Sequence, residues 1–473
     1  MVHGASLGWH RARAFHLGCS AACWRDRFSG LGGRAMSVGM IGLVSVVGLL
    51  ALMMVRVPIA TALTLSGVLG YAAAQGWPVT FRTLASIPYE LTGANPGVAY
   101  SFTVVPLFIF MGAVASRAQM SSELFAAANA LFSGIRGALA AATIGSCAAF
   151  SAICGSSIAT AATFSRVAIP EMRRYGYDME LATGSVASAG TLGILIPPSL
   201  ILVIYSLVAE ESIKALFAAA MIPGIALAVG YVLVIAVLAR IRPHLMPASP
   251  AQPLRERLRA LAGTWKLALL FVLAVVGIYA GWFSPTEAAA VASAAAVAIG
   301  FASRQLTLRG LWEAGIETVQ TTAMLFIIVI GAFIFSRLIV LTQFPGALAD
   351  WVNSAGLSPW MVIAAIVALY LLLGTFLEEV STLLITVPVL LPLVKGIGYD
   401  PIWFGVFVTV MSTVGLISPP VGLTVFVVQS QNPQIPVEKI FRGVIPFLVA
   451  DVVLLVALVA FPALATWLPK MLA

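Results

Sequence analysis

The stretch 176–199 reads GYDMELATGSVASAGTLGILIPPS, and the stretch 398–421 reads GYDPIWFGVFVTVMSTVGLISPPV. At a constant offset of 222 residues, the two stretches share a Gly-Tyr-Asp triplet, a Thr-x-Gly motif and a Pro-Pro pair. Apolar residues match easily by chance in a hydrophobic chain, but these residue types at one offset do not. The chain therefore contains an internal repeat.

The composition is that of a protein solvated mainly by lipid. Of the 473 residues, 61% are hydrophobic and 9% are charged, whereas soluble domains carry about 25% charged residues. Apolar runs long enough to cross a bilayer recur along nearly the whole chain. The net charge of +8 lies mostly in loops and near the N-terminus. It therefore indicates membrane topology and not a nucleic-acid-binding surface.

The apolar runs form two halves with the same parts in the same order. The predicted parts are a first repeat over 36–240 with an apolar stretch 138–169 and a broken span 179–208, a linker over 241–266, and a second repeat over 267–473 with an apolar stretch 361–394 and a broken span 402–428. Connecting helices are predicted at 119–133 and 303–319. Separate spans are predicted at 320–341 and 444–468.

Topology follows from the lysines and arginines. The arginine-rich linker is predicted to be cytoplasmic, and five crossings then separate the two repeats, so the repeats are inverted. The first half of the stretch 138–169 is just long enough to span alone, but its Gly-Ser-Ser break and basic flanks favour a re-entrant hairpin. The stretch 361–394 is predicted as a second hairpin with both ends outside. We therefore expect an all-α polytopic membrane protein with inverted repeats, two re-entrant hairpins and broken helices.

Each repeat has two breaks, one at the hairpin tip and one at the Pro-Pro pair. Proline lacks a backbone donor and clashes with the preceding turn, so two prolines together unwind a span. The freed carbonyl groups need partners, because lipid offers none. A hard cation such as sodium is one such partner, and the N-termini of the half-helices favour a carboxylate. The alternative is four kinks that serve packing alone, which their symmetric placement disfavours.

Two sodium sites and a substrate site are predicted at these breaks. The predicted residues of sodium site 1 are Gly155, Ser156, Ser157, Gly190, Thr191 and Gly193. Those of sodium site 2 are Glu378, Glu379, Thr382, Ser412, Thr413 and Gly415. The predicted substrate-binding residues are Ser156, Ser157, Pro197, Pro198, Ser199, Ser381, Thr382, Ser418 and Pro419. Sodium is the only metal predicted and no cofactor is expected. A histidine metal site is excluded because His244, in a basic loop, is the only histidine beyond the N-terminal segment.

Three further features have local interpretations. Glu378 and Glu379 lie in an apolar stretch, where ionisable groups are costly and usually functional. One of them is predicted to help hold sodium, and the alternative is a side-chain cap on the second half-helix. Arg166 is predicted to extend from the first hairpin to the cytoplasmic interface. Residues 284–287, Ser-Pro-Thr-Glu, predict a capping box with proline at the first helical position.

The N-terminal segment 1–35 is basic and fits no span. Such a segment beside a first span should stay in the cytoplasm, whereas the crossing count places it outside. We therefore expect the natural product to begin at Met36, or residues 1–35 to form a disordered tail.

Four motifs resemble the large membrane subunit of TRAP (tripartite ATP-independent periplasmic) transporters, within a region from about Met36 to the end. They are GSSIATAAT at 155–163 followed by PEM at 170–172, GTLGILIPPS at 190–199, FSPTEAAA at 283–290 and SPPVG at 418–422. The resemblance implies an elevator-type carrier of the bacterial inner membrane, in which a transport domain with two hairpins slides against a scaffold. It also implies one sodium ion near each hairpin tip, a small four-helix membrane subunit, and a periplasmic binding protein that delivers a small organic anion such as a carboxylate.

The chain departs from the family pattern at two places. Met411 and Thr413 stand where many members have Asn-x-Glu, and two acids stand at the second tip where many members have one. The resemblance therefore does not predict which anion is carried. A second reading is a stand-alone divalent-anion/sodium symporter, which shares the architecture and needs no binding protein. An intramembrane enzyme would need a catalytic dyad or metal cluster at membrane depth. The spans contain no histidine and no paired aspartates, so the protein is not expected to be an enzyme.

Overall fold

The computed structural model describes residues 37–89, 96–247 and 251–472, and every regular element in these ranges is helical. Seven helices of the described residues are long and apolar enough to cross a membrane, or up to nine if each of two bent pairs is one span. The predicted all-α polytopic fold is confirmed. The expectation for residues 1–35 lies outside the described ranges.

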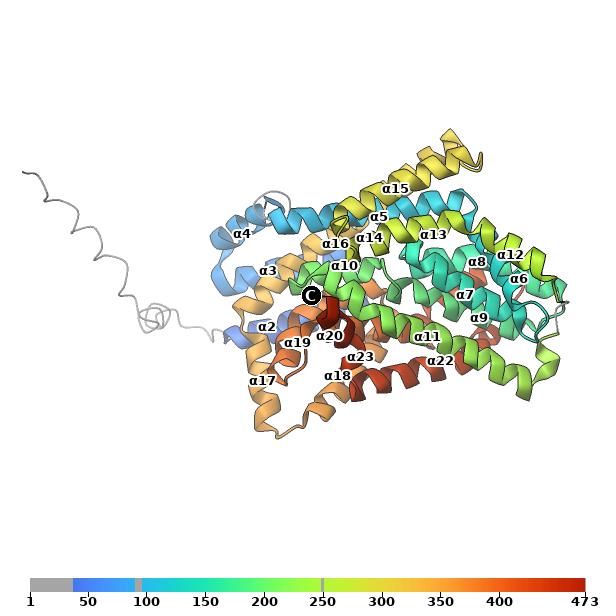
Figure 1. The fold of residues 1–473 in the computed structure, drawn as a ribbon. Coiled ribbons are helices and arrows are strands. Elements are labelled where there is room, and N and C mark those ends of the chain that lie inside the picture. Colours follow the sequence, from blue (N-terminus) through green and yellow to red (C-terminus); the bar gives the residue numbers. More distant parts are fainter. Residues whose placement is uncertain (1–36, 90–95, 248–250, 473) are drawn as a thin grey trace, which may run out of the picture.

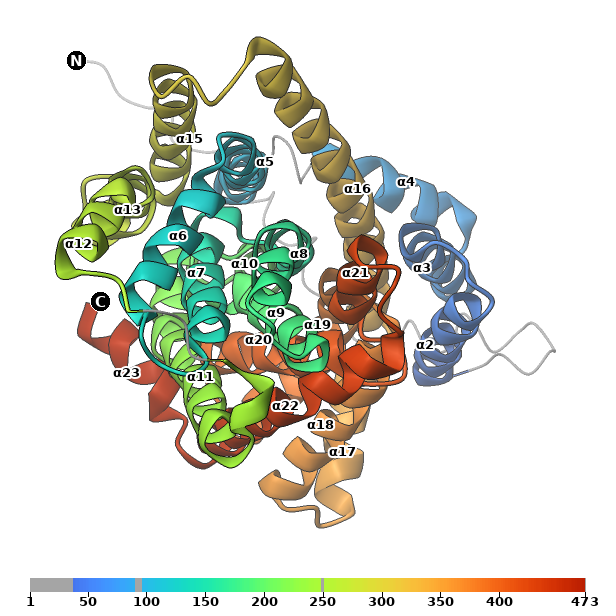
Figure 2. The same cartoon turned by 90° about the vertical axis from the view of Figure 1, so that its right-hand side faces the viewer.

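The two repeats contain matching sets of helices. The first set is α7 (Ala138–Cys154), α8 (Ser157–Arg174), α9 (Met179–Leu195), α10 (Leu200–Ala209) and α11 (Ile213–Ile241). The second set is α18 (Pro359–Phe376), α19 (Glu379–Gly396), α20 (Pro401–Ile417), α21 (Leu423–Gln431) and α22 (Val437–Ala460). Helices α7–α10 and α19–α21 lie in the interior, and α11, α18 and α22 lie along one side (Figure 1, Figure 2). The pairs α7–α8 and α18–α19 are the predicted hairpins, and α9–α10 and α20–α21 are the predicted broken spans.

The repeated Gly-Tyr-Asp triplet forms the same turn after each hairpin. Gly176 (φ 76°) and Gly398 (φ 92°) adopt the left-handed conformation that ends the preceding helix. The carboxylates of Asp178 and Asp400 then accept hydrogen bonds from the backbone N–H of the second residue of α9 and of α20, at 2.6 and 2.7 Å. The triplet recurs because both repeats need a helix end followed directly by a helix start.

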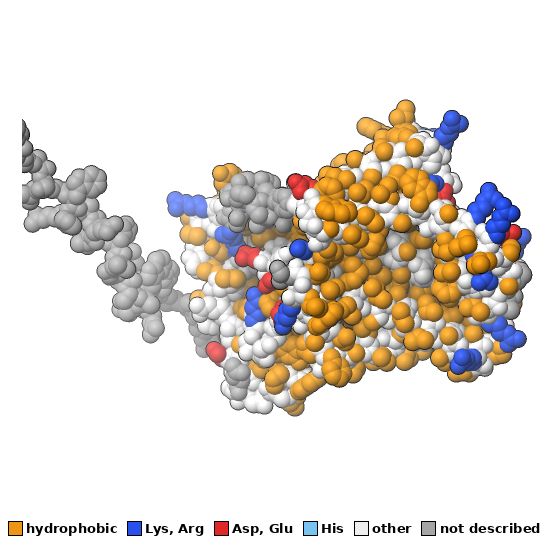
Figure 3. Space-filling model, viewed as in Figure 1, with side chains coloured by type: hydrophobic (Ala, Val, Ile, Leu, Met, Phe, Trp, Pro, Cys, Tyr) orange, Lys and Arg blue, Asp and Glu red, His pale blue; other side chains and the backbone are white. Residues whose placement is uncertain are grey.

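The two hairpins open toward opposite ends of the molecule, as inverted repeats require. At one end, the backbone N–H of Asp178 donates to the carbonyl of Leu245 beside the linker, at 3.1 Å. At the other end, Lys395 in the last turn of the second hairpin lies 3.9 Å from Glu211. Figure 3 shows a broad apolar surface, with Lys and Arg side chains gathered at the end where α12 (Leu254–Gly263) lies. The positive-inside rule predicts that this end is cytoplasmic.

The remaining helices pack around these two sets on the other sides. They are α2 (Val38–Met54), α3 (Ile59–Gln75), α4 (Trp77–Tyr89), α5 (Pro96–Arg117), α6 (Met120–Phe132), α13 (Trp265–Phe271), α14 (Gly277–Tyr279), α15 (Pro285–Ala302), α16 (Leu308–Leu341), α17 (Phe344–Ser354) and α23 (Ala463–Leu472). The predicted connecting helix α6 bends by 67° from α5. The predicted capping box starts α15, because the Ser284 hydroxyl accepts from the N–H of Glu287 and the Glu287 carboxylate accepts from the N–H of Ser284.

Two predicted boundaries are wrong. The connector at 303–319 and the span at 320–341 are largely one helix, α16, whose 34 residues extend over about 51 Å. Its polar first half remains helical because its acids have basic partners: Glu313 lies 3.1 Å from Arg309, and Glu317 lies 2.6 Å from Arg117. The last predicted span, 444–468, is interrupted before Pro462, since the residue preceding a proline disfavours helical geometry.

The orientation predicts which end of the molecule an external reagent can reach. Ala251→Cys, in the linker, should react only with maleimides that cross the membrane, and Glu211→Cys should react with an impermeant maleimide added to spheroplasts. Cys19 and Cys23 would be replaced by serine, and the native Cys147 and Cys154 are buried. Labelling is read as a mass shift on a gel. Reversed reactivity of the two sites would overturn the orientation.

Candidate functional site

The first hairpin turns at Gly155 and Ser156. Gly155 has φ 62°, and a Cβ there would lie 2.9 Å from the carbonyl oxygen of Pro198, so the turn favours glycine for both conformation and space. Ser156 then caps α8, because its hydroxyl accepts from the backbone N–H of Ala159 at 3.4 Å. The first tip therefore rests directly on the Pro-Pro loop of its own repeat.

The predicted glycines of the broken spans allow close packing against the hairpins. A Cβ on Gly193 would lie 2.8 Å from the carbonyl oxygen of Ser156, and Gly190 is similarly close to α8. In the second repeat, a Cβ on Gly415 would lie 2.8 Å from the Cα of Gly374 in α18. Small residues permit such backbone contact between membrane helices. In the first repeat, this contact places a carbonyl oxygen of the tip beside the broken span.

Carbonyl groups released at the two Pro-Pro breaks are bonded within each repeat. The Ser199 hydroxyl donates to the carbonyl of Ile194, and the Thr424 hydroxyl donates to the carbonyl of Leu416 at 2.9 Å. Ile194 and Leu416 are equivalent positions of the two repeats. A side-chain hydroxyl therefore satisfies the same released carbonyl in both, where sequence reasoning considered a cation as one possible partner.

The two hairpin tips meet at the centre of the molecule. The hydroxyl of Ser157, the first residue of α8, donates to Oε1 of Glu379, the first residue of α19, at 3.1 Å. The two residues are 222 positions apart, so they are equivalent in the repeats, and both are buried. The contact therefore joins the repeats at the point where each re-entrant hairpin turns back.

Three buried side-chain oxygens near the tips have no hydrogen-bond partner among the described residues. They are Glu379 Oε2, Thr160 Oγ1 and Ser381 Oγ. Buried polar atoms nearly always have a partner, and a buried carboxylate also needs a compensating charge. A hard cation with oxygen ligands would supply both. The atoms that the structure leaves unpaired are thus of the kind that a sodium ion prefers.

The structure distinguishes the two acids of the second tip. Glu378 occupies the N-cap position of α19, but its side chain makes no capping hydrogen bond. Its backbone carbonyl accepts from the Thr382 hydroxyl at 3.1 Å. Glu379 is the acid that contacts the opposite repeat, so it is the better candidate for a cation ligand.

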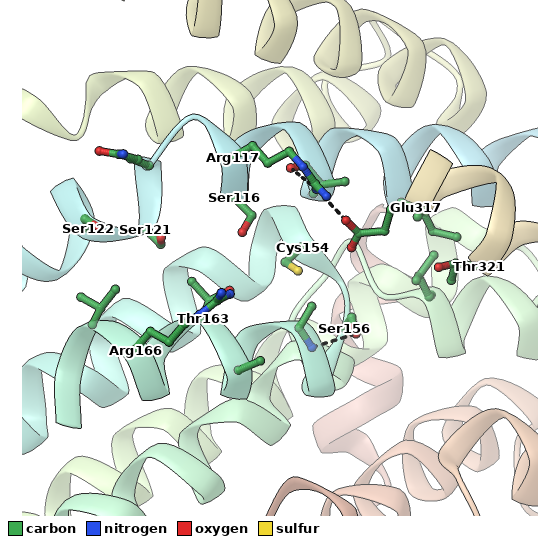
Figure 4. A pocket seen from close by; sticks show the side chains of 18 residues that line it. Ser116, Arg117, Ser121, Ser122, Cys154, Ser156, Thr163, Arg166, Glu317 and Thr321 are labelled. Atoms are coloured by element: carbon green, nitrogen blue, oxygen red, sulfur yellow. Dashed lines mark hydrogen bonds and ion pairs between the residues drawn. The ribbon is translucent and has the colours of Figure 1, made fainter. Parts of the chain in front are cut away.

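Two cavities adjoin the tips. The smaller, of about 340 Å³, is lined by both tips and by α16. The larger, of about 590 Å³, runs along α5 and α8 (Figure 4). Both are lined by Ser156, Glu317 and Thr321. Because α8 runs from the tip to the end where the linker lies, the space beside the tips extends toward the end that is predicted to be cytoplasmic.

The hydroxyls of Thr191 and Thr413 lie in a separate buried network that crosses between the repeats. The Tyr231 hydroxyl lies 2.9 and 3.0 Å from the two carboxylate oxygens of Asp451, which also accepts from the Thr413 hydroxyl at 3.3 Å. The Thr191 hydroxyl lies 3.5 Å from that of Tyr231. Sequence reasoning missed Tyr231 and Asp451. A lone acid amid an apolar span was an available signal for Asp451.

The other predicted residues lie along the broken spans. The hydroxyls of Ser412 and Ser418 donate to carbonyls of their own helix, at 3.0 and 2.7 Å. Pro197 and Pro198 are buried, whereas Pro419 is exposed. The first break is therefore enclosed by protein, and the second is more open.

Inverted repeats with broken helices, joined by two re-entrant tips, are the architecture of secondary transporters, which as a class bind their substrates near the interface of the repeats. Residues 46–464 match the family described as "Tripartite ATP-independent periplasmic transporter, DctM component". The chain belongs to this family: it is the large permease of a TRAP transporter, a multi-pass protein of the cell inner membrane and not an enzyme. The predicted family is confirmed.

Individual relatives agree with this assignment. The C4-dicarboxylate TRAP transporter large permease protein DctM of Pseudomonas aeruginosa is 38% identical over 376 residues, covering 79% of this chain and 87% of that protein. The sialic acid TRAP transporter large permease protein SiaM of Vibrio cholerae is 34% identical over 373 residues, covering 79% and 87%. Among solved structures, the YdaH transporter of Alcanivorax borkumensis has the same fold, with a TM-score of 0.59 at 15% identity over 83% of this chain and 90% of that chain.

Proposed function

We propose that this permease imports small organic anions bearing a carboxylate and couples their import to inward movement of sodium. A periplasmic binding protein delivers the anion, and a small four-helix membrane subunit completes the permease. The names of relatives that carry C4-dicarboxylates and sialic acid support the class of substrate. The observation that carries the proposal is the Ser157–Glu379 contact between the tips, with the second Glu379 oxygen left unpaired.

The acids of the second tip give a physical reason for coupling an anion to a cation. Glu378 and Glu379 both line the smaller cavity, so an arriving carboxylate meets negative charge in a site partly withdrawn from water. Two like unit charges about 4 Å apart repel by roughly 4 kcal/mol at an effective dielectric constant of 20. A cation bound at the tips removes this repulsion. By linkage, the anion then strengthens binding of the cation by the same factor.

The ligand types favour sodium over a divalent or transition metal. The described residues contain no group of three or more His, Cys, Asp or Glu side chains placed to hold a metal. The unpaired atoms at the tips belong to one carboxylate and two hydroxyls. Divalent calcium usually takes six to eight oxygen ligands, several of them carboxylates. A small set of neutral oxygens with one carboxylate therefore suits a monovalent hard cation better.

An elevator-type movement is part of this proposal. The moving unit would contain both hairpins and both broken spans, which pack closely through glycines. It would also contain α11 and α22, whose Tyr231–Asp451 contact links Thr191 of α9 to Thr413 of α20. Helices α5 and α16, which line the two cavities beside the tips, would belong to the fixed scaffold. Helix α5 also touches the first tip, where a Cβ on Gly112 would lie 2.9 Å from the Cα of Cys154. A unit that is tightly joined within itself and faced by cavities is suited to moving as one body.

Uptake by proteoliposomes tests the coupling. The permease would be reconstituted with the proposed small subunit and binding protein, and offered succinate, fumarate, malate and sialic acid. We expect uptake of at least one of these under an inward sodium gradient, with none when potassium replaces sodium and none with a proton gradient alone. Ser157→Ala and Thr382→Ala should each raise the sodium concentration for half-maximal uptake, because each removes an oxygen from the tips.

Equal uptake in potassium would contradict sodium coupling. Unchanged sodium dependence in both alanine variants would show that the tips are not the cation sites. Omission of the binding protein should abolish uptake, and undiminished uptake without it would favour the stand-alone symporter.

A further inference from the structure

The larger cavity has a basic lining that the proposed tip site does not use. Hydroxyls of Ser116, Ser121 and Thr163 line it together with the charged side chains of Arg117, Arg166 and Glu317. Figure 4 shows Arg117 extending from α5 and Arg166 from α8, with Glu317 beside Arg117. The cavity therefore brings two cations and one acid to the space that leads from the tips toward the cytoplasm.

These charges do not balance within the protein. Arg117 is paired with Glu317, with 2.6 Å between Nη1 and Oε2. Arg166 is exposed and has no ion-pair partner among the described residues. One positive charge is left over, and the planar donors of its guanidinium match a carboxylate in a two-point contact. The Arg166 side chain can keep its charge in water by extending toward the membrane interface. A charge that lines this cavity can also bind an anion that enters it.

Glu317 stands at the passage between the two cavities, because it lines both of them. An unpaired carboxylate there would repel an anion moving from the tips into the larger cavity. The ion pair with Arg117 neutralises it. Arg117 therefore affects the anion indirectly, by neutralising Glu317, whereas Arg166 contacts the anion directly.

We propose that the larger cavity is a second anion-binding site, on the exit path of the transported carboxylate, in which Arg166 binds the carboxylate and Arg117 neutralises Glu317. The inference rests on the proposed function and adds a substrate position to it. Arg166 belongs to the moving hairpin, whereas Arg117 and Glu317 belong to the outer helices α5 and α16. In an elevator-type movement the site is complete only while the tips face the cytoplasm.

Exchange measured in inverted membrane vesicles tests this site, because the cytoplasmic face is then outward. Labelled succinate is the probe, replaced by sialic acid if the uptake panel selects sialic acid. Arg166→Gln should raise the half-saturating carboxylate concentration at the cytoplasmic face about tenfold or more, because it removes both the charge and the two-point contact. The sodium concentration for half-maximal uptake from the periplasmic face should not change. Arg166→Lys, which keeps the charge but loses the two-point contact, should lie between Arg166→Gln and the wild type.

A double substitution separates the role of Arg117 from direct binding. Arg117→Gln should raise the same half-saturating concentration, because it leaves Glu317 unpaired. Combining it with Glu317→Gln should restore a value near that of the wild type. Each variant is first checked for an unchanged elution profile and apparent melting temperature in detergent.

The proposal is overturned if Arg166→Gln binds cytoplasmic carboxylate like the wild type, or if the double variant is no better than Arg117→Gln. Failure of the coupling mechanism would look different, since the wild type itself would then exchange carboxylate without any dependence on sodium.

Discussion

Glu379→Gln is expected to reduce sodium-driven uptake by about 100-fold or more, because in the proposed coupling Glu379 and sodium form a buried charge pair, and removing one charge of such a pair costs about 3 kcal/mol or more. The side chain is buried at the centre of the molecule, where Oε1 accepts from Ser157 and Oε2 has no partner among the described residues. Glutamine keeps the size of the side chain and an oxygen that can accept from Ser157. It removes the negative charge, so the loss would report on cation binding and not on folding. The measurement is the initial rate of uptake into proteoliposomes at several sodium concentrations.

Glu378→Gln is the matched control. Glu378 precedes Glu379 in the chain and also lines the smaller cavity, but its side chain does not cap α19. The hydrogen bond from Ser157 of the other repeat goes to Glu379. Its replacement should lower the rate much less and leave strong sodium dependence. The reverse outcome, with Glu379→Gln active and Glu378→Gln inactive, would show that the cation binds Glu378 and not Glu379. Normal uptake by both variants would show that neither carboxylate takes part in coupling.

The repeat made the central contact predictable in principle. Hairpins at equivalent positions of inverted repeats approach each other where the repeats meet, and an offset of 222 assigns Ser157 the same position as Glu379. The residue types at the tips, hydroxyls on one side and acids on the other, already indicated a cation. The triplets ending in Asp178 and Asp400 likewise predicted helix boundaries correctly. Glycine ends a helix and aspartate caps the next one through backbone interactions within a few residues.

Sequence reasoning was weaker wherever a residue's role depends on the face of a helix or on a distant helix. Thr191 and Thr413 were correctly placed near the breaks, but their hydroxyls face Tyr231 and Asp451. Those partners come from α11 and α22, and no local spacing relates them to the breaks. The continuity of α16 was also missed, because the polarity of its first half reads as a connector until Arg117 is seen beside Glu317. Local patterns thus identify turns and helix starts, whereas side-chain direction and long-range pairing require the packed structure.

Gly443→Leu is expected to prevent recovery of a folded, monodisperse permease. Gly443 of α22 packs on α9, and a Cβ there would lie 1.8 Å from the carbonyl oxygen of Glu180 and 3.2 Å from the Cα of Gly184. The obstructing oxygen belongs to the backbone of a buried helix, so no side-chain rotation relieves the clash. Membrane helices that approach this closely depend on small residues. Even Gly443→Ala should lower the apparent melting temperature in detergent by about 1–3 °C, because overpacking costs about 1–3 kcal/mol and a chain of this length loses about 1 °C per kcal/mol.

Gly48→Ala is the matched control, since Gly48 lies in the apolar helix α2 and a Cβ there meets nothing within 4 Å. Alanine exceeds glycine in helix propensity by about 1 kcal/mol, so this variant should melt no lower than the wild type. The contact of α9 with α22 also positions the network further along α22, where Phe447 packs on Tyr231 and Tyr231 bonds Asp451. A folded Gly443→Ala variant should therefore lose uptake along with stability, because separating α22 from α9 weakens the joint between the repeats. If Gly443→Ala instead melts and transports like the wild type, α9 and α22 do not touch through their backbones, and this contact does not join the two halves of the proposed moving unit.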